Sequence, residues 1–191
     1  MNTVPTRVLL VGMMGAGKTT VGRELARRTG WPFLDNDALV RELTGREPKE
    51  IDTEDGEDAL HAAEIRALQA AMARPGSAVI AVAGAIVDDA TATASVRSSR
   101  AHVVWLRGRP ETLRNRIGAG TGRRSDAQDL GWIAERAAER APRYRAIADQ
   151  VIDIENKRPR AIADAILGSI GSLPAGDGAA GDEAVDHDPP G

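Results

Sequence analysis

Short apolar runs alternate with amphipathic stretches along the first 170 residues of the chain. Five short apolar runs are typical of strands covered on both faces of a parallel sheet: Val8–Val11, Phe33–Leu34, Ala78–Val82, Val103–Leu106 and Val151–Ile154. The stretches between them have helical periodicity and predict helices at 18–29, 38–43, 58–73, 89–98, 111–117, 130–148 and 159–170. This alternation predicts an α/β fold, a three-layer sandwich around a five-stranded parallel sheet.

Composition limits the size of that fold and its partners. The chain has 191 residues, which predicts one domain, and we place it at 1–172. Residues 173–191 are rich in Gly, Ala, Asp and Pro and offer little apolar surface to bury, so we expect a disordered acidic tail. Without the tail's five acids, 1–172 holds 25 basic and 23 acidic residues, a net charge of +2.

Charge and hydropathy also exclude several classes of function. The whole-chain net charge of −3 argues against a protein that coats nucleic acid. No apolar run approaches the ~20 residues that span a membrane. The absence of cysteine excludes disulfides and thiolate metal sites. We therefore expect a cytoplasmic protein, monomeric, with a small-molecule substrate and neither nucleic acid nor membrane as partner.

A glycine-rich run follows the first predicted strand and opens the first predicted helix. Residues 12–19 read GMMGAGKT and fit the pattern G-x-x-x-x-G-K-[ST]. The glycines let successive backbone N–H groups face a phosphate, and the helix N-terminus adds partial positive charge. Lys18 would reach the β- and γ-phosphates, and the Thr19 hydroxyl would bind Mg²⁺. The residues predicted to bind the nucleotide are Gly12, Gly15, Ala16, Gly17, Lys18, Thr19 and Thr20.

Two carboxylates, Asp35 and Asp37, follow the second predicted strand. Ligands of open α/β sheets bind at this edge, beyond the carboxyl ends of the strands. If the run stays extended, both side chains point the same way. One could then support Mg²⁺, while the other accepts the proton of an acceptor hydroxyl. The alternative is an Asp-rich turn in which Asp37 caps the next helix.

The segment at about 118–129 differs from its neighbours. It contains three glycines and two adjacent arginines, with no apolar anchor beyond alanine. This composition favours a mobile loop with cationic tips, and a plain connector is the alternative.

The order and spacing of these motifs resemble the shikimate kinases, P-loop enzymes of the nucleoside-monophosphate-kinase type that phosphorylate shikimate from ATP. The resemblance spans roughly residues 7–170. It rests on the phosphate loop, the D-x-D at 35–37, Gly56-Glu57 with Glu64, and the run RAPRY at 140–144. It implies a P-loop fold of that type, ATP and Mg²⁺ as cofactors, and phosphoryl transfer to a small hydroxylated metabolite, with shikimate as the leading acceptor.

The resemblance also implies roles for individual residues. Asp35 would help to order Mg²⁺, and Asp37 would hold the acceptor hydroxyls and act with Lys18 in catalysis. Arg140 would grip the shikimate carboxylate, for which a guanidinium offers a planar two-donor fork. The segment at 118–129 would be a lid that carries the catalytic Arg123, and Arg116 would lie near the adenine.

Three departures from the family pattern fall on the acceptor side. Leu60-His61 stands where the family has Phe-Arg, and Ala83-Gly84-Ala85 replaces Gly-Gly-Gly. Arg124-Ser125-Asp126 replaces the Pro-Leu-Leu of the lid, which is also shorter. We expect Gly84 and His61 to contact the substrate, although a lone histidine is more often a structural residue.

These departures leave two alternatives open. The chain could be a paralogue, similar to gluconate kinases, that phosphorylates another small polyol or hydroxy acid. It could also be an ATP-binding regulatory protein that has lost catalysis.

Overall fold

The structure is a computed structural model that describes residues 6–118 and 129–171. Five strands in these ranges form one parallel sheet in the order β2-β3-β1-β4-β5. Their bounds are β1 (Arg7–Val11), β2 (Phe33–Asp35), β3 (Ala78–Ala81), β4 (His102–Arg107) and β5 (Gln150–Asp153). The predicted α/β class, the parallel sheet and all five strands are confirmed, whereas the predicted tail lies outside the described residues.

Apolar side chains fill both faces of the central strand. Leu9 and Leu10 of β1 are fully buried, and the register pairs Leu9 with Ile80 of β3 on one side and with Val103 of β4 on the other. A strand covered on both faces cannot alternate apolar and polar residues, which explains its continuous apolar run.

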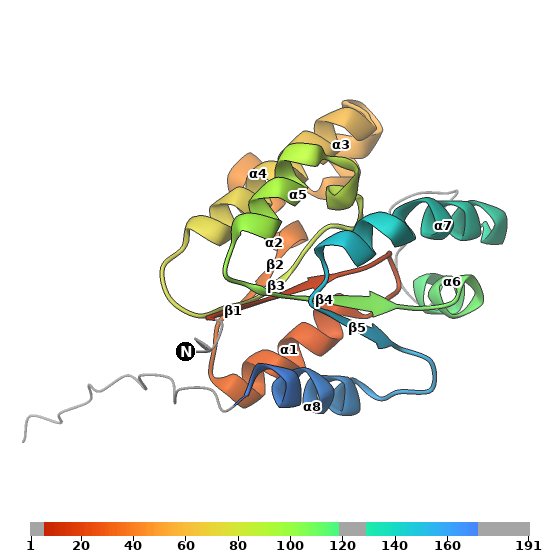
Figure 1. The fold of residues 1–191 in the computed structure, drawn as a ribbon. Helices are drawn as coiled ribbons and strands as arrows, with labels where there is room; N and C mark the ends of the chain where they lie inside the picture. The colour runs from red at the N-terminus through yellow and green to blue at the C-terminus, as the bar shows by residue number, and fades with distance from the viewer. Residues whose placement is uncertain (1–5, 119–128, 172–191) are drawn as a thin grey trace, which may run out of the picture.

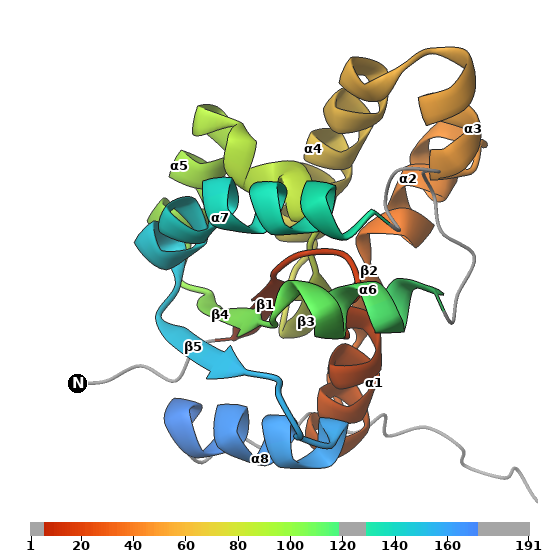
Figure 2. The ribbon, with the colours of Figure 1, turned by 90° about the vertical axis from the view of Figure 1, so that its right-hand side faces the viewer.

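Helices cover both faces of the sheet (Figures 1 and 2). Helices α1 and α8 pack together on one face, while α2, α4, α5 and α7 lie on the other. The helix bounds are α1 (Lys18–Thr29), α2 (Asn36–Thr44), α3 (Pro48–Glu54), α4 (Glu57–Ala73), α5 (Ala90–Ser98), α6 (Pro110–Gly118), α7 (Leu130–Ile147) and α8 (Pro159–Ile170). The three predicted layers are therefore confirmed.

Two short elements were absent from the prediction. The helix α3 begins with Pro48 and has a capping box between Glu47 and Glu50, a local signal that the sequence does carry. The 3₁₀ helix η1 (Gly84–Asp88) follows β3 and is a single turn, too short to show periodicity. Both elements border the site described below.

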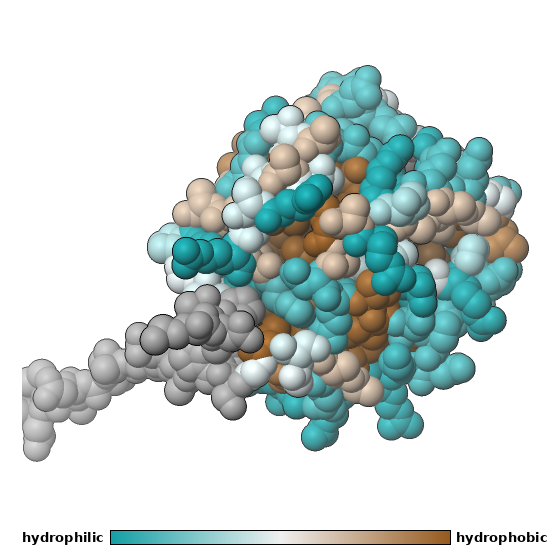
Figure 3. Space-filling model, in the orientation of Figure 1, coloured by the Kyte–Doolittle hydropathy of each residue, from teal (hydrophilic) through white to brown (hydrophobic). Residues whose placement is uncertain are grey.

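The surface is mostly polar. On the face shown in Figure 3, hydrophobic residues are visible mainly in recesses between hydrophilic ones. Among the described residues, Leu43 is the large apolar side chain that stands exposed. None of the described helices has the length and apolar character needed to cross a membrane.

Candidate active site

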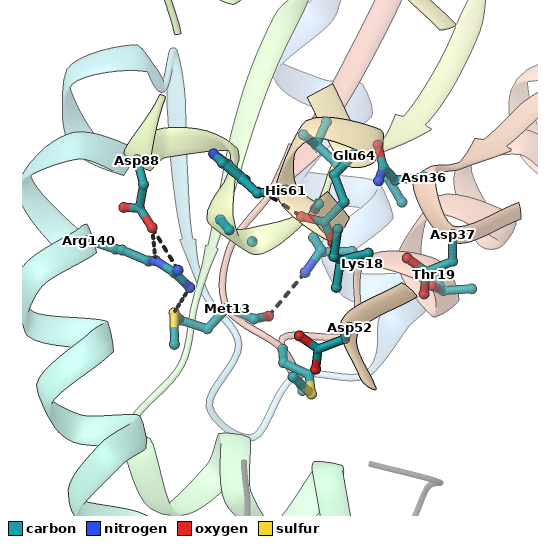
Figure 4. A pocket seen from close by; sticks show the side chains of 18 of the residues that line it. Met13, Lys18, Thr19, Asn36, Asp37, Asp52, His61, Glu64, Asp88 and Arg140 are labelled. Atoms are coloured by element: carbon teal, nitrogen blue, oxygen red, sulfur yellow. Dashed lines mark hydrogen bonds and ion pairs between the residues drawn. The ribbon is translucent and has the colours of Figure 1, made fainter. Parts of the chain in front are cut away.

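A cavity of about 550 Å³ opens at the carboxyl edge of the sheet (Figure 4). The glycine-rich loop between β1 and α1 forms one side of it, and α4, η1 and α7 form the other. Most of the predicted site residues line it, namely Gly15, Gly17, Lys18, Thr19, Asp35, Asp37, His61, Gly84, Arg116 and Arg140. The structure therefore brings the predicted nucleotide side and the predicted acceptor side together, while Arg123 lies outside the described residues.

Glycine is required at two positions of the loop. Gly12 has φ +142° and Gly15 has φ +80°, conformations that side chains rarely adopt. A Cβ on Gly12 would also lie 2.6 Å from the carbonyl oxygen of Leu106, and one on Gly15 would lie 2.5 Å from that of Leu113. The loop therefore packs too closely against β4 and α6 to carry side chains there.

The loop curls around the Lys18 ammonium. The Nζ atom donates to the carbonyl oxygen of Gly12 at 2.8 Å and to that of Met13 at 3.1 Å. Within the same loop, the N–H of buried Ala16 donates to the Met13 carbonyl at 3.1 Å. Lys18 is thus held at the mouth of the loop, which is where the pattern places a phosphate ligand. Thr20 is exposed on α1 and does not line the cavity.

Asp35 links the second strand to the phosphate loop. Its Oδ2 accepts from the Thr19 hydroxyl at 2.8 Å, and its Oδ1 accepts from the backbone N–H of Asp37 at 3.2 Å. The second contact makes Asp35 the N-cap of α2. The alternative in which Asp37 caps this helix is therefore wrong. The extended run also ends at Asp35, so the two carboxylates reach the cavity from a strand end and a first helical turn.

The pair Thr19–Asp35 fits a magnesium ion. A hydroxyl and a carboxylate are the hard oxygen ligands that Mg²⁺ prefers, and Mg²⁺ sites in kinases use one or two protein ligands together with phosphates and waters. Within 6–118 and 129–171, three or more acidic or histidine side chains nowhere gather into a metal cluster. Bound phosphates and waters would therefore have to supply the remaining ligands.

Arg140 of α7 is buried on the acceptor side, where its side chain is 11% exposed. Its Nε donates to Oδ2 of Asp88 at 2.9 Å, and its Nη2 lies 2.7 Å from the same oxygen. The other oxygen of Asp88 accepts from Arg143 at 2.5 Å. Asp88 thus occupies the Nε side of the guanidinium, and Nη1 contacts Met13 Sδ at 3.9 Å (Figure 4).

Tyr144 fixes the start of η1 against α7. Its hydroxyl donates to the carbonyl oxygen of Gly84 at 2.7 Å, and its ring stacks on Trp105 with centroids 5.6 Å apart. Burial raises the pKa of Tyr144, so it remains a neutral donor. A Cβ on Gly84 would lie 3.3 Å from the Gly12 carbonyl oxygen, so this wall also approaches the phosphate loop closely.

His61 lies on α4 and faces the same cavity. Its Nδ1 is 3.9 Å from Oε2 of buried Glu64, an ion-pair distance too long for a direct hydrogen bond. The Glu64 carboxylate raises the pKa of His61, and Asp89 and Asp88 add to the effect through their charge. His61 therefore lines the cavity, and its Nδ1 is buried without a hydrogen-bond partner.

Arg116 of α6 borders the nucleotide side. A Cβ on Gly17 would lie 3.6 Å from its Nη1, and its Nη2 is 3.5 Å from the carbonyl oxygen of Ile154. Arg116 therefore lies beside the phosphate loop, and its predicted place near the adenine stays a prediction.

Two residues of the site carried no signal in the sequence. Asp88 matters only because η1 meets α7, where Arg140 lies 52 residues further along the chain. Asn36 lies between the two predicted aspartates, and the structure buries it in the cavity wall with its Nδ2 without a hydrogen-bond partner. An asparagine next to a strand end is common in turns, so its type alone could not reveal this placement.

The sheet is parallel, and a phosphate loop lies at its carboxyl edge in a cavity that also holds acidic and cationic side chains. These features define a P-loop kinase of small molecules. The family model described as shikimate kinase matches residues 14–171. The shikimate kinase of Moorella thermoacetica is 39% identical over 164 residues, which are 84% of this chain and 91% of that protein. The chain belongs to the shikimate kinase family.

Solved structures agree with this assignment. The shikimate kinase from Acinetobacter baumannii, solved in complex with shikimate, superposes with a TM-score of 0.78 at 29% identity and covers 88% of this chain and 94% of its own. A gluconokinase from Sinorhizobium meliloti superposes with a TM-score of 0.61 at 20% identity and covers 87% of this chain and 92% of its own. The second likeness shows the shared fold alone.

Proposed function

We propose that the protein transfers the γ-phosphoryl group of ATP to a hydroxyl of shikimate in the presence of Mg²⁺. The observation that carries the proposal is that one cavity joins the phosphate loop to Asp37 and Arg140. A donor nucleotide and a small acceptor can therefore meet inside one space, as in-line transfer requires. Membership of the shikimate kinase family supports the choice of acceptor.

The nucleotide side would hold the phosphates and the metal. The loop glycines and Lys18 would bind the phosphates, and Arg116, which lies beside Gly17, would contact the base. Thr19 and Asp35 would hold Mg²⁺. When bound, Mg²⁺ neutralises charge on the phosphate oxygens.

The acceptor side would orient the substrate. Asp37 accepts the hydrogen of the reacting hydroxyl and acts as its base. Arg140 binds the carboxylate through the end of its guanidinium that Asp88 leaves open. His61 and Gly84 complete this wall, and Arg123 would close over the phosphates from the segment at 118–129.

A coupled ADP-release assay with a panel of acceptors tests the proposal. We expect turnover of shikimate that needs Mg²⁺ and stops with EDTA. If another polyol or hydroxy acid turns over and shikimate does not, the acceptor is wrong and the kinase class stands. If ATP binds and no acceptor turns over, the protein is not an enzyme of this class.

Asp37→Asn isolates the role of the base. We expect a loss in kcat of about 10²- to 10⁴-fold, because the amide cannot take up the proton. Asp164→Asn is the matched control, since Asp164 lies on α8 and pairs with Arg28 away from the cavity. An Asp37→Asn variant with wild-type kcat would contradict this mechanism.

The assembly state and the location are proposed separately. We propose a monomer, supported by the described surface, on which Leu43 is the exposed large apolar residue. Light scattering of the purified protein tests it. We propose a cytoplasmic location because ATP is the expected donor, and cell fractionation tests it.

A further inference from the structure

Arg140 is the arginine of the acceptor side, and a carboxylate of this chain already binds it. Asp88 Oδ2 lies 2.9 Å from Nε of Arg140 and 2.7 Å from its Nη2. The other cations of the described lining, Lys18 and Arg116, belong to the nucleotide side. The lining also carries several acids, namely Asp35, Asp37, Asp52, Glu57, Asp58, Glu64 and Asp88. An anionic acceptor therefore meets a cation whose charge is already balanced in part.

The geometry of this ion pair leaves one end of the guanidinium for a ligand. Asp88 binds from the side, through Nε and Nη2, while Nη1 contacts the sulfur of Met13 at 3.9 Å. Figure 4 shows the guanidinium between these two residues. A thioether is a weak acceptor, so Nη1 and the outer hydrogen of Nη2 can still bind an oxygen. A ligand carboxylate at this end would share the guanidinium with Asp88, and the two anions would repel each other.

Contacts on two sides keep Asp88 beside Arg140. Its Oδ1 accepts from Nη1 of Arg143, and the turn that carries it is fixed to α7 because the Tyr144 hydroxyl donates to the Gly84 carbonyl at 2.7 Å. Removing the partner of a buried cation is also costly, and Arg140 is buried. A ligand is therefore expected to join Asp88 on the guanidinium and not to displace it.

We propose that Asp88 sets the acceptor specificity of the cavity: its charge on Arg140 weakens the preference for a carboxylate, so that an uncharged polyhydroxylated ring of similar size is a second acceptor. This inference rests on the proposed function and extends it to a second class of substrate. Asp88 is a positioning residue, since it contacts Arg140 and not a reacting atom. The acids of the lining suit such a ring, because its hydroxyls can donate to carboxylates without adding negative charge.

The transfer to an uncharged ring follows the same chemistry as the transfer to shikimate. A ring hydroxyl oxygen forms a bond to the γ-phosphorus of ATP while the bond from that phosphorus to the β-phosphate oxygen breaks. ADP leaves, and the hydroxyl proton passes to Asp37. The two classes of acceptor therefore differ only in what they place against Arg140.

Asp88→Asn separates the charge of Asp88 from its shape. The amide oxygen can still accept from Nε of Arg140, while the negative charge is lost. Arg143 is largely exposed and can turn to solvent when its partner becomes neutral. The variant should therefore keep Arg140 in place, strengthen the binding of a carboxylate, and leave the binding of an uncharged acceptor unchanged.

The test compares shikimate with its methyl ester, which has the same ring and hydroxyls and no charge. We expect wild type to phosphorylate the ester with a kcat/KM within roughly tenfold of that for shikimate. In Asp88→Asn the KM for shikimate should fall about three- to tenfold at unchanged kcat, and the KM for the ester should stay level. Arg140→Met should shift the preference toward the ester, because Asp88 would then oppose the shikimate carboxylate with no cation between them.

Asp89→Asn is the matched control for a change of charge. Asp89 is the next residue in the chain and caps α5 through the N–H of Ala92, and asparagine caps a helix as well as aspartate does. We expect less than about a twofold change in either KM, because solvent and salt screen a charge that is not on Arg140.

Thermal unfolding gives a second readout that does not need turnover. Saturating shikimate should raise the Tm of Asp88→Asn by more than it raises the Tm of wild type, because tighter binding stabilises the folded state further. If wild type phosphorylates shikimate and not the ester, or if Asp88→Asn changes both KM values equally, the inference is overturned and the proposed function stands. If neither wild type nor Asp88→Asn phosphorylates shikimate or the ester, the proposed function fails and this inference fails with it.

Discussion

The two sides of the cavity are built in different ways. The nucleotide side is made mostly from backbone, with its shape set by Gly12 and Gly15 and a single loop that wraps Lys18. The acceptor side is made from side chains of α4, η1 and α7 that bind one another, above all Asp88 and Arg140. A site formed by main-chain groups tolerates substitutions elsewhere in the chain. A site formed by paired side chains can change its specificity through a single substitution.

Substitution of Lys18 should have the largest effect. Lys18→Met removes the positive charge closest to the transferred phosphoryl group, so we expect kcat to fall by roughly 10²- to 10³-fold. The ADP-release assay measures it, with exposed Lys49 of α3 changed to Met as the control. If Lys18→Met kept the wild-type kcat, Lys18 would not act on the transferred phosphoryl group.

Substitution of Arg140 should weaken the binding of shikimate and leave the binding of ATP nearly unchanged. Arg140→Met removes the buried cation of the acceptor wall, and we expect the KM for shikimate to rise by about 10- to 150-fold, or about 1.5–3 kcal/mol. ATP affinity by calorimetry should stay within a few-fold. Arg143→Met is the matched control, since Arg143 binds the same Asp88 from a side chain that is 52% exposed. Equal losses for ATP and shikimate would mean that the two sides are not independent.

A substitution beneath the loop should test how far the nucleotide side depends on packing. A Cβ on Gly22 of α1 would lie 2.3 Å from the ring of Phe33, in the strand that carries Asp35. We expect Gly22→Ala to lower the free energy of unfolding by about 1–3 kcal/mol through overpacking, as measured by urea denaturation. Gly168→Ala is the control, because a Cβ there meets open space and favours the helix. Equal stability of the two variants would contradict this packing argument.

The smallest effect should come from the hydroxyl that joins η1 to α7. Tyr144→Phe removes the hydrogen bond to the Gly84 carbonyl and leaves that oxygen without this partner. We expect a loss of about 0.5–1.5 kcal/mol in unfolding free energy and a few-fold rise in the KM for shikimate. If the KM for ATP rose and the KM for shikimate did not, Gly84 would belong to the nucleotide side of the cavity.

The sequence predicts the fold and the nucleotide side because their signals are local. Continuous apolar runs mark the strands, and the loop, Lys18 and Thr19 form one contiguous pattern next to the first of them. Asp35 could be placed at the sheet edge but not identified as the cap of α2, since that depends on where the strand ends. The elements missed, α3 and η1, are too short to show a period.

The acceptor side could be predicted only through resemblance. Arg140 stands out because of the run RAPRY, and no property of its own helix distinguishes it from Arg136 or Arg143. Its partner Asp88 could not be found, because their contact depends on how α7 crosses η1. Long-range pairs of charged side chains are formed by the tertiary fold and leave no trace in local spacing.

The strand order has a consequence for the motions of the enzyme. The loop that holds Lys18 extends from β1, which is hydrogen-bonded to β3 on one side and to β4 on the other. Amide protons of this central strand should be among the last to exchange with solvent, because they are released only when the whole sheet opens. The helices of the acceptor wall have no such anchor, since they are attached to the sheet by side chains. We therefore expect the amide protons of these helices to exchange with solvent sooner than those of β1.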